Sequence, residues 1–225
     1  MSAKPPCPGL RTFSYSLLDA ADPDIKITSV KGKSFILSNN YLQKLIENDN
    51  IDDFSSVIEE RVFLEYNDKN EIAYIKGVKE NYTNITKIDS SLSIGSWLNP
   101  NYSNTAVAGR IIALKLSMGI RNFTEPLTIM VPKPGKGFIN PNNAFYKTNV
   151  QIVGLYTGTE AFESKFVFVD FNLAKDLLKF KSNEITSIEI KLKDSNFSDE
   201  VAEDLQKAFG DNYKVQTKEQ LNAIF

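Results

Sequence analysis

Strand and helix patterns alternate through the first third of the chain. Apolar side chains occupy every second position of the later part of D-P-D-I-K-I-T (residues 22–28), which is typical of a half-buried strand. Apolar residues with helical spacing follow an Asn-rich N-cap at 38–40. Two later strand patterns flank a polar turn at 67–70, and this arrangement predicts a hairpin. The pattern therefore predicts strands over 22–28, 34–37, 59–66 and 71–78, and a helix over 41–46.

The C-terminal part repeats this α/β alternation. A strand over 184–192 precedes a helix that begins at the cap 196–198 and ends at Gly210, a residue suited to the turn after a helix. The apolar face of this helix holds Val201, Ala202, Leu205, Ala208 and Phe209. A short strand and a last helix follow, and Thr217 with Gln220 predicts a capping box.

The middle of the chain is strand-rich and holds one long loop. Apolar positions between 106 and 118 predict a helix that packs on a sheet and ends at Gly119, and residues 127–131 predict a buried strand. The segment 132–148 (P-K-P-G-K-G-F-I-N-P-N-N-A-F-Y-K-T) is rich in proline, glycine and lysine and has no acidic residue. Proline disfavours both helix and central strand, so a long loop is predicted here. Together the patterns indicate the α+β fold class.

Composition narrows the class of protein. The chain has 225 residues, of which 42% are hydrophobic and 24% charged, as in ordinary globular proteins, and its net charge is −2. A nucleic-acid partner is not expected, because binding one needs a basic face. There is no histidine, which excludes His-based catalysis and ordinary zinc sites. We therefore expect no enzyme activity, no metal and no cofactor. The adjacent carboxylates Glu59-Glu60 and Asp52-Asp53 are interpreted as solvated surface, because neighbours on a strand point to opposite faces.

Four segments carry a family resemblance. They are A-V-A-G-R-I-I-A-L-K-L (106–116), P-L-T-I-M-V-P-K-P-G-K-G (126–137), V-Q-I-V-G-L-Y (150–156) and F-V-F-V-D-F-N-L-A-K-D-L-L (166–178). Their order resembles the extracytoplasmic domain of the lipoprotein-releasing ABC transporter permeases of the LolC/LolE type, within the wider MacB/FtsX-like permease group.

The resemblance implies an architecture and a location. It implies a discontinuous β-α-β porter-like lobe over 22–90 and 183–225, and an inserted β-rich sabre-like lobe over 91–182. Residues 1–21 are interpreted as an N-terminal scar and a juxtamembrane helix, with apolar helical spacing from Leu10 onwards. Neither an 18-residue apolar span nor a signal-peptide pattern occurs. The implied location is the periplasmic face of the bacterial inner membrane, with both membrane spans absent from this chain.

The resemblance also implies partners and a mechanical role. The partners would be an ATPase subunit, a second permease subunit, a lipoprotein substrate and a soluble periplasmic lipoprotein carrier. ATP-driven closure would reach this domain through two helical stalks and help to expel a lipoprotein from the membrane. The alternative within the same fold is a MacB/FtsX-like permease domain that serves efflux or cell-wall regulation.

Three interpretations of the loop 132–148 remain open. It is a solvated hairpin loop, a phosphate-binding loop around Gly135-Lys136-Gly137, or a protein-binding arm. The phosphate interpretation is weak, because the spacing G-x-x-x-x-G-K-[ST] is missing. In the lipoprotein-releasing permeases a hook at this place binds the carrier, which implies exposed aromatic anchors and lysines that would meet an acidic rim. The carrier-binding residues implied by location are Pro132, Lys133, Pro134, Lys136, Phe138, Pro141, Phe145 and Tyr146.

Overall fold

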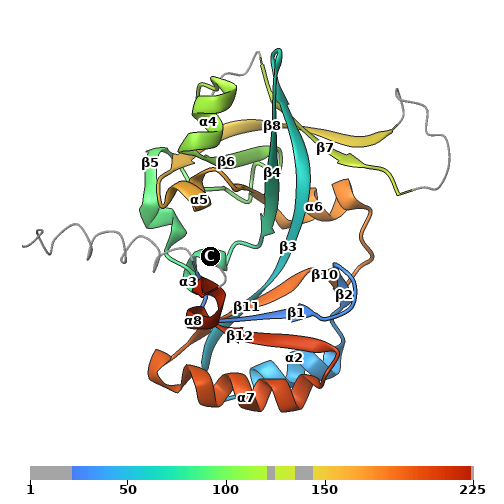
Figure 1. The fold of residues 1–225 in the computed structure, drawn as a ribbon, viewed down its shortest axis with the longest axis vertical. Coiled ribbons are helices and arrows are strands. Elements are labelled where there is room, and N and C mark those ends of the chain that lie inside the picture. The colour runs from blue at the N-terminus through green and yellow to red at the C-terminus, as the bar shows by residue number, and fades with distance from the viewer. Residues whose placement is uncertain (1–21, 121–124, 135–143, 224–225) are drawn as a thin grey trace, which may run out of the picture.

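The computed structural model describes residues 22–120, 125–134 and 144–223, and this part of the chain is an α+β structure built on one large sheet (Figure 1). Ten strands form the sheet in the order β12-β1-β11-β3-β4-β9-β6-β8-β5, with β7 paired to both β3 and β8. The predicted α+β class is confirmed at this level. The strands are β1 (Ile25–Ser29), β3 (Ile51–Tyr66), β4 (Lys69–Val78), β5 (Leu92–Gly95), β6 (Thr105–Gly109), β7 (Leu127–Pro132), β8 (Phe145–Tyr156), β9 (Phe166–Asp170), β11 (Ser187–Leu192) and β12 (Tyr213–Thr217), while β2 (Phe35–Ile36) and β10 (Glu184–Ile185) form a separate ribbon.

The lower part of Figure 1 is a four-stranded section, β12-β1-β11-β3, with α2 (Asn39–Ile46) and α7 (Ser198–Phe209) beneath it. Alternation along β1 turns Ile25 and Ile27 toward the helices, and both are fully buried. The amphipathic stripe of α7 meets them, as its sequence predicts. The lower core consists of Ile25, Ile27, Phe35, Leu37, Leu45, Ile51, Ile185, Ile188, Ile190, Leu192, Val201, Ala202, Leu205 and Phe209.

Six strands of the upper part pair in a closed ring. The order is β3-β4-β9-β6-β8-β7, and β7 returns to β3 through the pairs Phe63↔Met130 and Leu64↔Ile129. The helices α4 (Arg110–Leu116) and α6 (Phe171–Leu178) add side chains to the apolar core of this ring. A closed ring leaves few unpaired strand edges. Each edge that stays unpaired is a place where another strand could pair.

A third apolar cluster fills the junction between the lower and upper parts. Its large members are the aromatic side chains of Tyr82, Tyr156 and Phe168, all nearly fully buried. Tyr82 lies on the short helix α3 (Tyr82–Ile85), whereas Tyr156 and Phe168 lie on β8 and β9. The 3-10 turn η1 (Ile88–Ser91) and α5 (Glu160–Glu163) add Ile88 and Phe162 to the cluster. The junction is therefore packed.

The strand β3 crosses from the lower core to the upper core. Its N-terminal residue Ile51 belongs to the lower core, whereas Ile58 and Leu64 belong to the upper core. The β3–β4 hairpin thus shares its apolar side chains with the segment predicted as the inserted lobe. The predicted lobe boundaries at 22–90, 91–182 and 183–225 stay predictions.

The helix predicted over 106–118 is wrong in its first part. Residues Thr105–Gly109 form the strand β6, and the helix α4 begins only at Arg110. Its end is also earlier than predicted, because Ser117 adopts the left-handed conformation (φ 54°) in place of Gly119. The apolar run at 106–108 is buried on both faces of the sheet, which is why strand and helix could not be told apart by periodicity.

The C-terminal predictions are confirmed in their main features. The helix α7 ends at Phe209, and Gly210 has a positive φ of 80°. The last helix α8 (Lys218–Asn222) has the predicted capping box, in which the N–H of Thr217 donates to Gln220 Oε1 at 3.2 Å. The predicted strand 184–192 is divided at Thr186 into β10 and β11, and the turn η3 (Ser195–Phe197) precedes α7. In the described ranges, no helix has the length and apolar character needed to cross a membrane.

Candidate functional site

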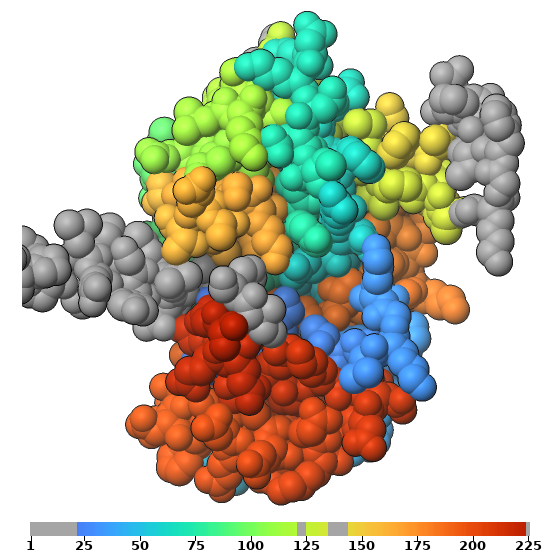
Figure 2. Space-filling model, in the orientation of Figure 1, coloured from blue at the N-terminus to red at the C-terminus, as the bar shows by residue number. Residues whose placement is uncertain are grey.

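The strands β7 and β8 form an arm that stands out from the body of the molecule (Figures 1 and 2). Their antiparallel pairing runs from Leu127↔Val150 to Pro132↔Phe145, and the N–H of Lys133 donates to the carbonyl of Ala144 at 2.8 Å. The predicted loop 132–148 is therefore wrong at both ends, because ladder hydrogen bonds continue to Pro132 on one side and begin at Phe145 on the other. Proline is accepted at Pro132 because the N–H of the next residue, Lys133, points to β8, so the nitrogen of Pro132 points to the other side, where pairing with β3 ends at Met130.

The predicted carrier-binding residues fall into two groups. The structure describes Pro132, Lys133, Pro134, Phe145 and Tyr146, which it brings together at the end of the arm. Lys136, Phe138 and Pro141 lie outside the described residues, as does the Gly135-Lys136-Gly137 segment of the phosphate interpretation.

Two aromatic side chains expected to be exposed anchors are instead half-buried. The ring of Phe145 packs edge-on against Phe63 of β3, with centroids 5.7 Å apart. Tyr146 packs against the upper core and lies under the amines of Lys133 and Lys179, at 5.2 and 5.7 Å from its centroid. These contacts attach the arm to the body, so Phe145 and Tyr146 have a structural role even if they also meet a partner.

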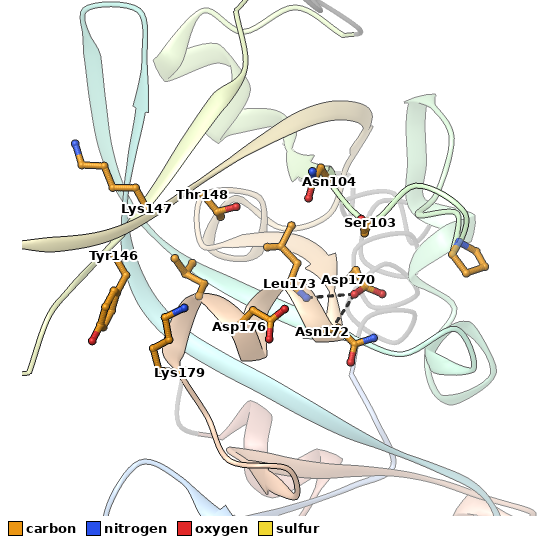
Figure 3. A pocket seen from close by; sticks show the side chains of 12 residues that line it. Ser103, Asn104, Tyr146, Lys147, Thr148, Asp170, Asn172, Leu173, Asp176 and Lys179 are labelled. Carbon is orange, nitrogen blue, oxygen red and sulfur yellow. Dashed lines mark hydrogen bonds between the residues drawn. The ribbon is translucent and has the colours of Figure 1, made fainter.

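A groove of about 400 Å³ runs between the arm and α6 (Figure 3). Thr148 of β8 and Asn104 reach toward it from one side, and Asp170 and Asp176 lie on the other. The Asp170 carboxylate caps α6 by accepting hydrogen bonds from the N–H groups of Asn172 and Leu173, at 2.8 and 3.2 Å. Its complete lining is Pro100, Ser103, Asn104, Tyr146, Lys147, Thr148, Asp170, Asn172, Leu173, Asp176, Leu177 and Lys179.

A buried ionic network lies at the junction of the two parts. Nζ of Lys76 on β4 is 2.9 Å from Oε1 of Glu189 on β11, and the hydroxyl of Tyr82 donates to Glu189 Oε2 at 2.7 Å. Lys26 on β1 bridges two carboxylates, at 3.0 Å from Glu59 Oε2 and 3.5 Å from Glu189 Oε1. Four strands and one helix therefore meet at a single set of charges.

The charges of this network hold each other ionised. Burial alone would raise the pKa of Glu189, but the cations of Lys76 and Lys26 and the hydrogen bond from Tyr82 lower that pKa below its ordinary value. Burial would likewise lower the pKa of Lys76, yet the carboxylates of Glu189 and Glu59 raise it. Burial and the neighbouring Glu189 charge together raise the pKa of the Tyr82 hydroxyl well above its ordinary range, so it stays protonated and donates.

Sequence reasoning missed this network. The interpretation of Glu59 and Glu60 as solvated is wrong, because both side chains are mostly buried and are paired with Lys26 and Lys33. A signal was present in the strands A-Y-I-K-G-V and S-I-E-I-K-L, where Lys76 and Glu189 interrupt apolar runs. A charged residue in a buried strand needs a partner of opposite charge, although the sequence does not say which residue that is.

Within the described ranges, no group of three His, Cys, Asp or Glu side chains could hold a metal ion.

Both ends of the described chain meet beside this network. The strands β1 and β12 are paired from Ile25↔Thr217 to Ser29↔Tyr213, and the N–H of Lys218 donates to the carbonyl of Asp24 at 3.0 Å. Asp22, the first described residue, lies close enough to Lys76 and Glu189 for their charges to affect its pKa, which burial raises.

The fold is similar to that of two solved transporter domains. The described structure is similar to the extracellular domain of the noncanonic ABC-type transporter YknZ from Gram-positive bacteria, with a TM-score of 0.57 and 12% identity over 86% of this chain and 99% of that one. It is also similar to the periplasmic region of MacB from Actinobacillus actinomycetemcomitans, with a TM-score of 0.58 and 11% identity over 92% of this chain and 94% of that one. No family model and no curated protein matches the sequence. At such low identity the likeness establishes the fold.

Proposed function

We propose that this chain is the extracytoplasmic domain of an ABC transporter permease of the MacB/FtsX-like group. The likeness in fold to the MacB and YknZ domains carries the proposal. The adjacency of Asp24 and Lys218, near the two ends of the described ranges, supports it, because a domain held between two membrane spans needs its first and last elements on one side. The domain performs no chemistry of its own in this proposal, and its ATPase and second permease subunit would act on it through the connecting spans.

Within that group we propose the lipoprotein-releasing type as the specific function. Support comes from the order of the four sequence segments and from the projecting β7–β8 arm, which lies where the resemblance puts the carrier-binding hook. The arm has lysines and no acidic residue between Pro132 and Thr148, so it would attract an acidic rim on a soluble carrier. The domain would help to move a lipoprotein out of the membrane and pass it to that carrier.

The buried ionic network gives the proposal a physical route for force. Lys26 lies on β1, close to the first described residue, and Glu189 lies on β11, which pairs with β1, while Glu59 and Lys76 lie on the hairpin that supports the arm. Charges that are mutually paired and buried resist separation, because each would be left unpaired in a low-dielectric interior. Movement at the ends would therefore carry the upper ring along as a unit.

The specific function is tested by capture of the cognate lipoprotein carrier on the immobilised chain. We expect Phe138→Ala to weaken capture at least about tenfold, the effect of losing one anchor residue. The matched control is Phe197→Ala, which removes an exposed ring (46% exposed) from the lower part. Phe145→Ala is a poor probe, because that ring supports the arm through Phe63.

The lipoprotein-releasing function and the broader permease assignment are tested by different experiments, so that either can be rejected without the other. Equal carrier capture by Phe138→Ala and the unchanged chain would remove the hook assignment and favour the efflux or cell-wall alternative. Co-purification of an ATPase subunit with the full-length membrane protein tests the broader proposal. If no ATPase subunit accompanies the full-length protein, the permease assignment itself is wrong.

A further inference from the structure

One side of β8 is open along the arm. From Phe145 to Val150 this strand pairs with β7, and on its other side β6 begins only at the pair Thr105↔Gln151. Among the residues that the structure describes, no strand pairs with that other side between Phe145 and Asn149. Unpaired strand edges are templates for another strand, and this one lies beside a groove.

Two hydrogen bonds fix the direction in which the backbone groups of this edge point. Lys133 N–H donates to Ala144 on the β7 side, whereas Gln151 N–H donates to Asn104 on the β6 side, at 2.9 Å. Backbone groups alternate between the two sides along a strand, so the even-numbered residues of this stretch face β7. Phe145, Lys147 and Asn149 therefore direct their N–H and C=O groups into the open side.

Two carboxylates lie on the wall opposite this edge, in a groove whose lining also includes the amines of Lys147 and Lys179. Asp170, the N-cap of α6, and Asp176 within α6 line the groove, and Asp176 is exposed. Within the described part of the chain, neither carboxylate takes part in an ion pair, although Asp170 caps its helix. Figure 3 shows both side chains below the strand that carries Thr148. A strand laid against β8 would alternate its side chains, and every second one would point toward these carboxylates.

We propose that this groove binds an extended segment of a partner polypeptide, which pairs with the Phe145–Asn149 edge as an added strand and carries basic side chains toward α6. The segment would continue the line of β6, which already pairs with β8 beyond Gln151. Main-chain hydrogen bonds supply affinity in this mode of recognition, and the side-chain positions over α6 supply selectivity. The proposal goes beyond the proposed function, because it concerns the opposite edge from β7 and holds whether or not the arm binds a carrier.

Binding is tested with a fluorescein-labelled decapeptide of alternating threonine and lysine, followed by anisotropy on the full chain. The matched probe alternates threonine and glutamate, and we expect it to bind at least about tenfold more weakly at low salt. A second probe has the lysine sequence with N-methyl groups on alternate residues, made in both registers. The register that removes the pairing N–H groups should lose binding at least about fivefold, as expected for lost main-chain bonds.

Substitutions locate the site on the protein. Lys147→Pro removes an edge N–H that points away from β7, and should weaken the lysine probe at least about fivefold relative to Lys147→Thr, which keeps that N–H. Asp176→Lys should weaken it about three- to tenfold, with an effect that shrinks as salt rises. Glu203→Lys on α7 makes the same charge change in the lower part and should have no effect.

Several outcomes would overturn the proposal. Equal binding of both N-methyl registers on the unchanged chain would exclude strand pairing, independently of whether any variant folds. Equal affinities of Lys147→Pro and Lys147→Thr would exclude this edge. Failure of the unchanged chain to bind the lysine probe would mean that Lys147 only protects an exposed edge from association. Dimerisation of the chain that vanishes in Lys147→Pro would identify a second copy as the occupant.

Discussion

Nζ of Lys76 and Oε1 of Glu189 lie 2.9 Å apart, with side chains that are 5% and 0% exposed. The pair reaches across β3, since β11 precedes and β4 follows that strand in the order of the sheet. It therefore joins the lower and upper parts through side chains as well as through the backbone of β3. The hydroxyl of Tyr82 donates a hydrogen bond to the other carboxylate oxygen of Glu189, Oε2. Each oxygen of this buried carboxylate therefore has a partner, which a buried ion pair needs in order to be stable.

Breaking this pair on one side should be costly. We expect Glu189→Gln to lower the free energy of unfolding by about 3–5 kcal/mol, because it leaves the buried Lys76 cation without its nearest counter-charge. The measurement is urea denaturation at pH 7, with Glu203→Gln on the exposed face of α7 as a control expected to stay within about 0.5 kcal/mol. A loss below about 1 kcal/mol for Glu189→Gln would show that the network carries little of the stability.

The Glu189 carboxylate should also make the free energy of unfolding depend on pH in the acidic range. The folded pKa of Glu189 lies below its ordinary value, so the unfolded chain takes up the proton first as the pH falls. The contribution of Glu189 to the free energy of unfolding is fully present above its pKa in the unfolded chain, which is about 4.3. That contribution is lost as the pH falls through its lower pKa in the folded chain. Denaturation curves between pH 7 and pH 3 should show a shallower loss of stability in Glu189→Gln than in the unchanged chain. Parallel pH profiles for the two proteins would contradict this assignment.

A close backbone approach predicts the effect of one glycine. A Cβ placed on Gly109, at the start of α4, would lie 1.9 Å from the carbonyl oxygen of Glu163. Gly109→Ala should therefore lower the free energy of unfolding by roughly 1–3 kcal/mol or more, because the α5 backbone must move. Gly119→Ala is the control, since nothing lies within 4 Å of a Cβ there, and it should be neutral or stabilising by up to about 1 kcal/mol. Similar melting temperatures for the two variants would contradict the tight packing at Gly109.

Elements buried on one face could be predicted from the sequence. The stripe that includes Val201 and Leu205 defines α7, and Gly210 marks its end, because both signals are local. The strand β6 was mistaken for helix because both of its faces are buried, which removes the period-two signal. The open and closed sides of β8 depend on which strands become its neighbours, and that is a property of the whole sheet.

The candidate site could be predicted only in part. The composition of 132–148 indicated a long loop, but the ladder from Pro132 to Phe145 and the packing of Phe145 on Phe63 depend on residues far away in the sequence. The ionic network has the same character, since Tyr82 and Glu189 are 107 residues apart. Charges inside apolar strands signal that partners exist, whereas the fold alone decides which charges meet.

The Phe63–Phe145 contact predicts how firmly the arm is held. Edge-to-face pairs add about 0.5–1.5 kcal/mol beyond the area they bury, so Phe63→Ala should loosen the arm by a comparable amount. Amide hydrogen exchange at Lys133, whose N–H donates to Ala144, should accelerate about two- to tenfold, while exchange at Val167 in the ring should hardly change. Ile94→Ala is the matched control, because Ile94 is an exposed apolar residue (57% exposed) on β5, which pairs with the far end of β8. Unchanged exchange at Lys133 in Phe63→Ala would mean that the β7–β8 ladder alone holds the arm, and that this aromatic contact contributes nothing to its position.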